Sequence, residues 1–310
     1  MSSLTPASTL EKQTATDSNG CVWDMERVAC LLCGDTGNTV AHTWVCPYPA
    51  IPMEFAIAAC NGCGFKYTNP RLSREALADY YASQNPYSGE EYHAVDEVRG
   101  RYDEFLDSLA EAGVTHGRML EIGCDKGQLL KIARERGFEV EGLEPSASAR
   151  IAREQFGLDV KEGMFDSQPY EDDSFDAVVL LDVLEHISDP LQSLQKVHRI
   201  LKPGGLVLVK VPNVRREYGL YPRIRGGALG FGAHEHLSHF SQATLADAYQ
   251  RAGLEVAAWR GFLPLDVQGG AARIVWGMVS WLGGIVGRVW KSWPDHHVAL
   301  VCVGRKPVGS

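Results

Sequence analysis

Apolar runs alternate with amphipathic stretches between residues 118 and 211, and this alternation constrains the fold more than any other feature. The apolar runs suited to buried strands are residues 119–123, 138–143, 176–181 and 206–211. Helical patterns follow the first three of them and begin at residues 127, 146 and 190. Such alternation predicts a parallel sheet covered by helices, with the ligand site outside the carboxyl ends of the strands.

Two copies of one short cysteine motif precede this region. The motifs are Cys30-Leu31-Leu32-Cys33-Gly34 and Cys60-Asn61-Gly62-Cys63-Gly64, with 26 residues between Cys33 and Cys60. Each predicts a tight turn that presents two thiolates, with glycine where the backbone needs a positive φ. Two such turns supply the four sulfurs of a closed tetrahedral site, so we predict a structural zinc ion in a small zinc-ribbon-like module. The alternatives are a redox pair or two unrelated cysteine pairs.

Composition limits the class of partner. The net charge is −9 and the pI about 5.6, which argues against DNA or RNA as a partner because nucleic-acid binding usually needs a basic face. Residues 1–20 are mostly small and polar, without a basic segment followed by an apolar one. They predict a disordered tail rather than a secretory signal, and therefore a cytoplasmic protein with reduced cysteines.

Acidic residues mark the ends of the first two predicted strands. The first strand ends in Glu121-Ile122-Gly123-Cys124-Asp125-Lys126-Gly127, and Glu144 follows Gly127 by 17 residues. A carboxylate at the second position can accept both ribose hydroxyl protons. Glu121 would repel a pyrophosphate but suits the cationic methionine end of S-adenosylmethionine. The pattern therefore favours a methyltransferase over a dehydrogenase.

An ordered set of short blocks carries a family resemblance. The blocks are Leu120-Glu121-Ile122-Gly123, Leu143-Glu144-Pro145, Ser174-Phe175-Asp176, Leu184-Glu185-His186, Leu201-Lys202-Pro203-Gly204-Gly205 and Val211-Pro212-Asn213. Over about residues 117–254 the chain resembles the class I S-adenosylmethionine-dependent methyltransferases. The resemblance implies a Rossmann-like, mostly parallel sheet whose last strand, expected at residues 297–304, is antiparallel.

The same resemblance implies which residues contact the cofactor. Glu121, Gly123, Cys124 and Gly127 are expected around the methionine part, in the turn that also contains Asp125. Glu144, followed by Pro145, is expected to hold the ribose, and Met164 and Phe165 to border the adenine. Leu181 and Asp182 are expected to face the reacting centre. Asp125 replaces the usual middle glycine of the turn. It either narrows the approach to the cofactor or contacts the methionine amino group.

The predicted domain organisation follows from these motifs. We expect a cysteine module at residues 21–70, a helical linker or cofactor lid at 71–115 and the methyltransferase domain at 116–306. Within the last, a substrate loop spans 214–240 and an apolar Trp-rich insertion spans 263–296.

A narrower resemblance concerns the substrate side. The paired cysteine turns, Asp125 and the run Glu235-His236-Leu237-Ser238-His239-Phe240-Ser241 are similar to nucleotide-sugar C-methyltransferases. That group implies His236 as general base with Glu235 beside it, and His186 is the second candidate. Ala233 stands where that group usually has a tyrosine, and this chain is shorter than the members of that group.

The substrate class remains open between several possibilities. We expect a small molecule, most simply a sugar or a nucleotide-linked or lipid-linked saccharide. Four arginines of the substrate loop either receive its phosphate or form a solvated basic loop: Arg215, Arg216, Arg223 and Arg225. Residues 274–290 either touch a membrane surface peripherally or pack on the domain. An RNA methyltransferase that uses the cysteine module to bind RNA, and a catalytically inactive binding protein, are the alternatives.

Overall fold

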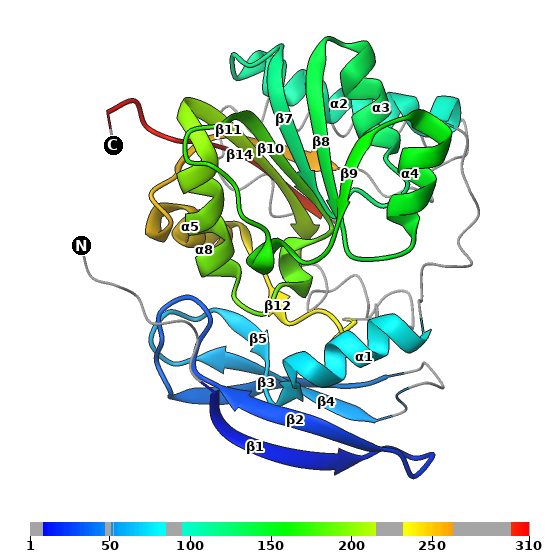
Figure 1. Cartoon of the computed structure of the whole chain (residues 1–310). Helices are drawn as coiled ribbons and strands as arrows, with labels where there is room; N and C mark the ends of the chain where they lie inside the picture. The colour runs from blue at the N-terminus through cyan, green and yellow to red at the C-terminus, as the bar shows by residue number, and fades with distance from the viewer. Residues whose placement is uncertain are drawn as a thin grey trace, which may run out of the picture.

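The computed structural model describes residues 9–46, 51, 53–84, 95–214, 232–262 and 299–309. It comprises a layered α/β domain above an N-terminal β-rich module (Figure 1). The basic part of the predicted substrate loop and the Trp-rich insertion lie outside the described residues. Among the described helices, none is long and apolar enough to cross a membrane.

The central sheet has seven strands in the order β13-β14-β11-β10-β7-β8-β9. Their bounds are β7 Gly117–Ile122, β8 Phe138–Glu144, β9 Asp159–Glu162, β10 Phe175–Leu181, β11 Leu201–Pro212, β13 Glu255–Phe262 and β14 Ala299–Arg305. The five strands from β11 to β9 are parallel, and β14 runs antiparallel to both of its neighbours. The predicted mostly parallel sheet with an antiparallel last strand is confirmed.

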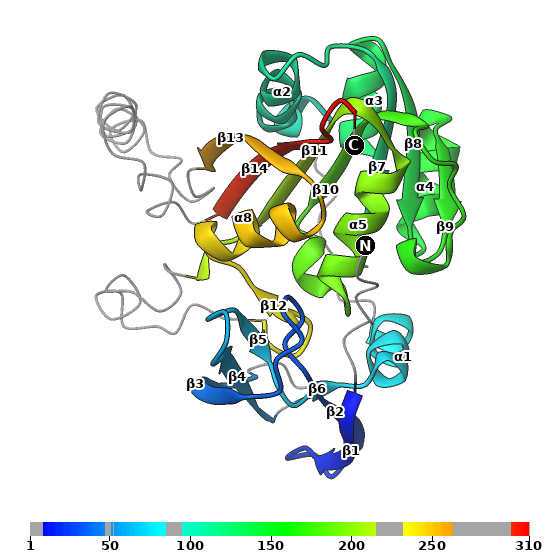
Figure 2. The ribbon, with the colours of Figure 1, turned by 90° about the vertical axis from the view of Figure 1, so that its left-hand side faces the viewer.

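Helices cover both faces of this sheet (Figure 2). One face carries α2 Val95–Glu111, α3 Gln128–Glu135 and α4 Ser148–Phe156; the other carries α5 Pro190–Ile200 and α8 Gln242–Arg251. Side chains alternate along a strand, so Ala177 and Val179 of β10 pack on the face covered by α2, α3 and α4. Val178 and Leu180 pack on the face covered by α5 and α8. Two short 3-10 helices, η1 Phe165–Ser167 and η2 Leu184–His186, follow the carboxyl ends of β9 and β10.

The N-terminal module contains two small sheets and a helix. The strands β1 Thr9–Thr16, β2 Val22–Val28 and β6 Arg71–Leu72 form one sheet, and α1 Arg74–Gln84 follows β6. The other sheet has the order β12-β5-β4-β3, with β3 Asn38–Val45, β4 Glu54–Cys60, β5 Lys66–Thr68 and β12 Ser238–His239. Since β12 comes from the segment just before α8, this sheet joins the module to the main domain.

The predicted disordered tail is wrong for residues 9–16. They form β1, which pairs antiparallel with β2 from Thr16↔Val22 onward. The connecting turn is held by Asp17, whose carboxylate accepts hydrogen bonds from the Asn19 amide at 2.9 Å and the Trp23 indole at 2.8 Å. Because β1 is mostly exposed, its polar composition is compatible with a strand at the edge of a sheet.

The module and the main domain share one hydrophobic core. The Phe65 ring of the module lies 5.2 Å from the Phe240 ring, which precedes α8. Both belong to the same buried cluster as Leu184 of η2 and Leu245 of α8. The module is therefore packed onto the edge of the sheet where the ligand site is expected.

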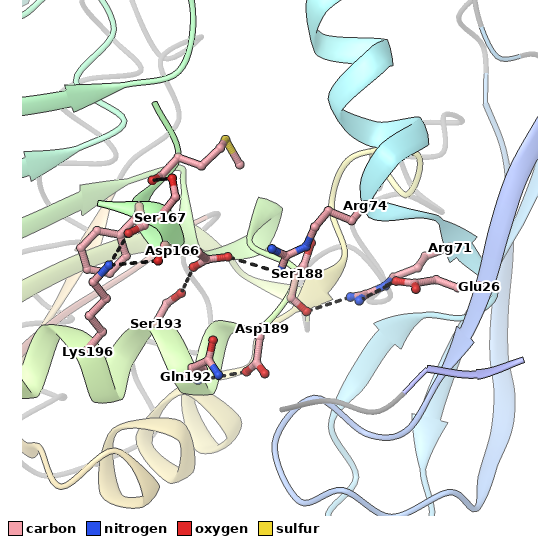
Figure 3. A network of polar contacts seen from close by, with 12 residues as sticks. Glu26, Arg71, Arg74, Asp166, Ser167, Ser188, Asp189, Gln192, Ser193 and Lys196 are labelled. Atoms are coloured by element: carbon pink, nitrogen blue, oxygen red, sulfur yellow. Dashed lines mark hydrogen bonds and ion pairs between the residues drawn. The ribbon is translucent and has the colours of Figure 1, made fainter. Parts of the chain in front are cut away.

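A buried ion pair within the module also contacts the main domain (Figure 3). Arg71 lies 2.8 Å from the Glu26 carboxylate, and both side chains are less than a tenth exposed. Arg71 also donates a hydrogen bond of 2.9 Å to the carbonyl of Ser188, directly after η2. Nearby, Arg74 and Asp166 form a longer, more exposed contact of 3.4 Å.

Replacing Arg71 by alanine should lower the free energy of unfolding by about 3 to 5 kcal/mol, because Glu26 would remain buried without its partner. Denaturant unfolding measures this change. Arg27→Ala is the matched control, since Arg27 forms an exposed pair with Glu11 at 3.7 Å and should change stability by less than about 1 kcal/mol. Equal effects of the two substitutions would contradict the role given to the buried pair.

Candidate functional site

The glycine turn after β7 occupies the point where the strand order reverses. β7 lies between β8 and β10, and ligands of open α/β sheets bind at such a switch point. Gly123 has φ of +71°, and a Cβ there would lie 2.4 Å from Cγ2 of Val183. Asp125, in place of the expected glycine, also adopts the left-handed region with φ of 44°. The turn therefore keeps its shape despite the substitution.

Glu144, at the end of β8, is fixed by backbone amides. Its Oε2 accepts a hydrogen bond from the Asp125 amide at 3.0 Å, and its Oε1 accepts one from the Ser146 amide at 2.8 Å. Each carboxylate oxygen can accept a further hydrogen bond. The expected ribose-binding carboxylate is thus oriented by the glycine turn on one side and by the chain beyond Pro145 on the other.

Glu121, at the end of β7, is the strongest indication of a cationic ligand. Its side chain is buried, and Oε2 has no hydrogen-bond partner among the described residues. Burial, followed by the charges of Asp125 and Glu144, raises the pKa of Glu121 well above its ordinary value. An ammonium group beside it would satisfy this oxygen and favour the ionised form. The methionine part of S-adenosylmethionine carries such a group, so the residues fit this cofactor.

Tyr102 of α2 borders the same carboxylates. Its pKa is raised by burial and then by the charge of Glu121, with smaller contributions from Asp125 and Asp182. The sequence places Tyr102 on the apolar stripe of a helix but does not indicate its proximity to the glycine turn. The charges around the glycine turn therefore act on Tyr102 of α2.

The remaining expected cofactor residues differ in exposure. Met164 is exposed, whereas Phe165 is buried with Tyr170 and lies under the Lys196 ammonium at 4.4 Å. The Met164 side chain is thus accessible, as an expected cofactor contact requires, whereas Phe165 packs in the core beneath η1. Cys124 is buried beneath the turn, and burial raises the pKa of its thiol.

Asp182 follows Leu181 at the end of β10. It has φ of 55° and forms an ion pair with Lys210 of β11. Its amide donates a hydrogen bond of 3.0 Å to the Lys210 carbonyl. The carboxyl ends of β10 and β11 are therefore held together beside the glycine turn, and Leu181 and Asp182 lie where the resemblance predicts the reacting centre.

The predicted catalytic residues lie together, from two segments distant in sequence. The His186 and His236 rings meet edge to face with centroids 4.7 Å apart. Side-chain N and O atoms of Glu185, His186 and His236 lie within 4.8 Å of one another. The Leu237 amide donates a hydrogen bond of 2.8 Å to the Glu185 carbonyl and so joins the two segments.

Burial affects the protonation of two residues of this cluster, His186 and Glu235. Burial and then the charge of His236 lower the pKa of His186 well below its ordinary value, and burial raises the pKa of Glu235 to about 7. A neutral imidazole can accept a proton from a substrate. Glu235 titrates in the same pH range and can share that proton.

The other two histidines of the 234–239 run have structural surroundings. The His234 ring stacks on Trp44 at 5.6 Å and meets Tyr80 edge-on at 5.5 Å. His239 is buried, and its Nε2 lies 3.2 Å from the Thr68 hydroxyl. The His236 ring, in contrast, lies against the His186 ring.

The four cysteines of the two predicted turns converge. Sγ of Cys30 lies 3.5 Å from Sγ of Cys63, and Sγ of Cys33 lies 3.5 Å from Sγ of Cys60. The predicted turns are confirmed: Gly34 and Gly64 have φ of +75° and +72°, and each donates an amide hydrogen bond of 2.9 Å to the first cysteine of its motif. The two turns are near-copies of each other, and they present their thiols to a common point.

Comparisons with known proteins agree with this geometry. A sequence model described as a methyltransferase domain matches residues 95–258, more than half of the 310-residue chain. The chain belongs to the methyltransferase domain family and is an S-adenosylmethionine-dependent methyltransferase.

The chain is similar to two relatives with the same description. A ubiquinone biosynthesis O-methyltransferase from Ruegeria pomeroyi is 30% identical over 178 residues, which cover 54% of this chain and 71% of the relative. A protein of the same description from Pseudomonas aeruginosa is 32% identical over 161 residues, 47% of this chain and 67% of the relative.

The fold is also found among solved structures. A chain of the Haloferax volcanii complex between the Trm112 methyltransferase activator and a protein assigned as a methyltransferase matches with a TM-score of 0.50. The identity is 21%, over 76% of this chain and 99% of that chain. This likeness concerns the fold.

Replacing Glu144 by glutamine should weaken S-adenosylmethionine binding about tenfold to a hundredfold, because hydrogen bonds to a charged group contribute about 1.5 to 3 kcal/mol. Isothermal titration calorimetry measures the affinity. Glu139→Gln, at an exposed position of the same strand, should leave it unchanged. Undiminished binding by Glu144→Gln would place the ribose elsewhere.

Proposed function

We propose that this methyltransferase modifies a small acceptor that contains a sugar, either a nucleotide-linked or lipid-linked saccharide or a related metabolite. His236 acts as the general base, Glu235 assists it and His186 is the second candidate for that role. The observation that carries the proposal is the contact between the His236 and His186 rings at 4.7 Å, beside a carboxyl group with a pKa of about 7.

The sugar-linked acceptor is supported by a combination of features rather than by one residue. The paired cysteine turns, Asp125 in the glycine turn and the Glu235-His236 pair are the features that resemble nucleotide-sugar C-methyltransferases. In the structure β5 of the cysteine module pairs with β12, which begins two residues after His236. Two of the three features on which the resemblance rests are therefore physically connected.

The chemistry assigned to the chain is proton removal and alignment. Bound S-adenosylmethionine supplies an electrophilic methyl group, which passes to the acceptor nucleophile as the bond from sulfur to carbon breaks. An imidazole nitrogen of His236 takes the proton that the acceptor loses, and Glu235 in its ionised form stabilises the resulting imidazolium. Holding both reactants in line can account for much of the rate enhancement.

A hydroxyl group of a phenol is the second candidate acceptor. It is favoured by the names of the two relatives, both described as ubiquinone biosynthesis O-methyltransferases. A neutral imidazole serves either a hydroxyl or a carbon acid. Methyl transfer from labelled S-adenosylmethionine to nucleoside-diphosphate sugars, lipid-linked saccharides and dihydroxyphenols separates the candidates. Transfer confined to dihydroxyphenols would reject the saccharide proposal.

His236→Gln should lower kcat about a hundredfold to ten-thousandfold while the affinity for S-adenosylmethionine stays nearly intact, because the base acts on the acceptor. Steady-state kinetics and calorimetry measure the two quantities. His42→Gln, at an exposed position of β3, is the control and should behave as the unmodified enzyme. Lost cofactor binding in a folded His236→Gln protein would contradict its assignment as the base.

We also propose that the four cysteines hold a structural zinc ion. Tetrahedral zinc with bonds of about 2.3 Å separates its sulfur ligands by about 3.8 Å, close to the two separations of 3.5 Å. A disulfide would require about 2.05 Å. Four cysteines also leave no ligand position for a reacting water, so the ion stabilises the module.

Purified protein should contain about one zinc ion per chain, and Cys63→Ser should lose it together with thermal stability. Elemental analysis and thermal unfolding measure both effects. Cys21→Ser is the control, because Cys21 is exposed and lies outside the cluster. Full zinc content in Cys63→Ser would exclude this site.

A further inference from the structure

We infer that Thr68 positions His236, and that the cysteine module thereby sets the geometry of the Glu235-His236 turn, called the catalytic turn below. The inference rests on the proposed role of His236. Thr68 is the last residue of β5 and is fully buried, and its hydroxyl contacts the His236 carbonyl rather than the His236 ring in the hydrogen bonds described. It is a positioning residue because it acts through the backbone on which His236 is carried.

Thr68 contacts three residues of the segment from His236 to His239. Its hydroxyl donates a hydrogen bond of 2.8 Å to the His236 carbonyl, and its amide donates one of 3.1 Å to the Leu237 carbonyl. Its hydroxyl also lies 3.2 Å from Nε2 of His239. One side chain thus fixes the start and the end of the segment from His236 to His239.

The hydrogen-bond roles determine the tautomer of His239. The Thr68 hydroxyl has one proton, which it gives to the His236 carbonyl, so at the second contact its oxygen must accept from Nε2–H. Burial lowers the pKa of His239 to about 3, so the ring is neutral. A neutral ring with its proton on Nε2 is therefore a spectroscopic signature of this arrangement.

The second cysteine turn, Cys60 to Gly64, in turn fixes the strand that carries Thr68. β5 begins at Lys66, three residues after Cys63, and the Cys60 amide donates a hydrogen bond of 2.9 Å to the Phe65 carbonyl. On its other edge β5 pairs with β4, where Thr68 lies opposite Ile57. A displacement of the turn would therefore move β5, and with it the His236 backbone. Because a misplacement of about 1 Å can cost about a hundredfold in rate, this coupling matters for catalysis.

Valine in place of Thr68 separates positioning from packing. It fills nearly the same volume but leaves the His236 carbonyl and the His239 Nε2–H without the partner that Thr68 provides. Serine restores the hydroxyl and removes only a methyl group. Thr43→Val on β3 is the matched control, because Thr43 is exposed on the same sheet.

The experiment compares these variants in the full-length, zinc-loaded protein. Long-range proton–nitrogen spectra report the histidine tautomers, with the His239 signals assigned by His239→Gln. Calorimetry gives the affinity for S-adenosylmethionine, and kinetics use whichever nucleoside-diphosphate sugar or dihydroxyphenol turns over in the acceptor screen.

Thr68→Val should alter the His239 signals and lower kcat about tenfold to a hundredfold, with cofactor affinity and acceptor KM within about threefold. Thr68→Ser and Thr43→Val should keep the original signals and most of the rate. If Thr68→Val does not fold, Thr68→Cys replaces the hydroxyl by a weaker donor and should give the same changes in smaller measure.

Unchanged histidine spectra and kcat in Thr68→Val would overturn the inference. Equal losses in Thr68→Val and Thr68→Ser would do so as well, since they would indicate packing alone. The spectra need no acceptor, so they decide the positioning role even if no tested acceptor reacts. Full activity of His236→Gln would instead reject the base assignment. The spectra would then still show whether Thr68 positions this segment.

Discussion

The pairing of β5 with β12 is the interaction on which the candidate active site depends. It joins Tyr67 and Lys66 of the cysteine module to Ser238 and His239, directly after the catalytic turn. Through this pairing a module near one end of the sequence becomes part of the wall beside the carboxyl ends of β7 and β10. Two further contacts hold the module against the main domain. Phe65 packs on Phe240, and Arg71 donates a hydrogen bond to the Ser188 carbonyl.

The two halves of the site have opposite electrostatic character. The cofactor side gathers the carboxylates of Glu121, Asp125 and Glu144 around a glycine turn, and the burial of Glu121 makes this side receptive to a cation. The proposed acceptor side contains His186, whose pKa burial holds well below its ordinary value, and Glu235 with a pKa of about 7. We therefore expect the cofactor side to bind the positively charged donor and the proposed acceptor side to receive the proton that the acceptor loses.

Much of the fold and the cofactor side could be predicted from local patterns. The alternating apolar runs predicted the parallel sheet, and the repeated Cys-x-x-Cys-Gly motif predicted two tight turns with positive φ at Gly34 and Gly64. A serine followed three residues later by a threonine before a helix is a local pattern of the same kind, and Ser241 and Thr244 form a reciprocal cap at the start of α8. β1 was missed because its exposed, polar sequence resembles a disordered tail and its partner strand is what stabilises it.

The sequence by itself determined the class of the protein, because strand and helix periods, turn glycines and strand-end carboxylates are requirements met within a few residues. Only the tertiary structure decided which of three neighbouring histidines meets His186 and which residue fixes the catalytic turn. Thr68 and His236 are 168 residues apart, and no local pattern records their hydrogen bond. The effect of Glu121 on the pKa of Tyr102 arises for the same reason: helix packing, rather than the residues adjacent in sequence, sets the neighbours of Tyr102.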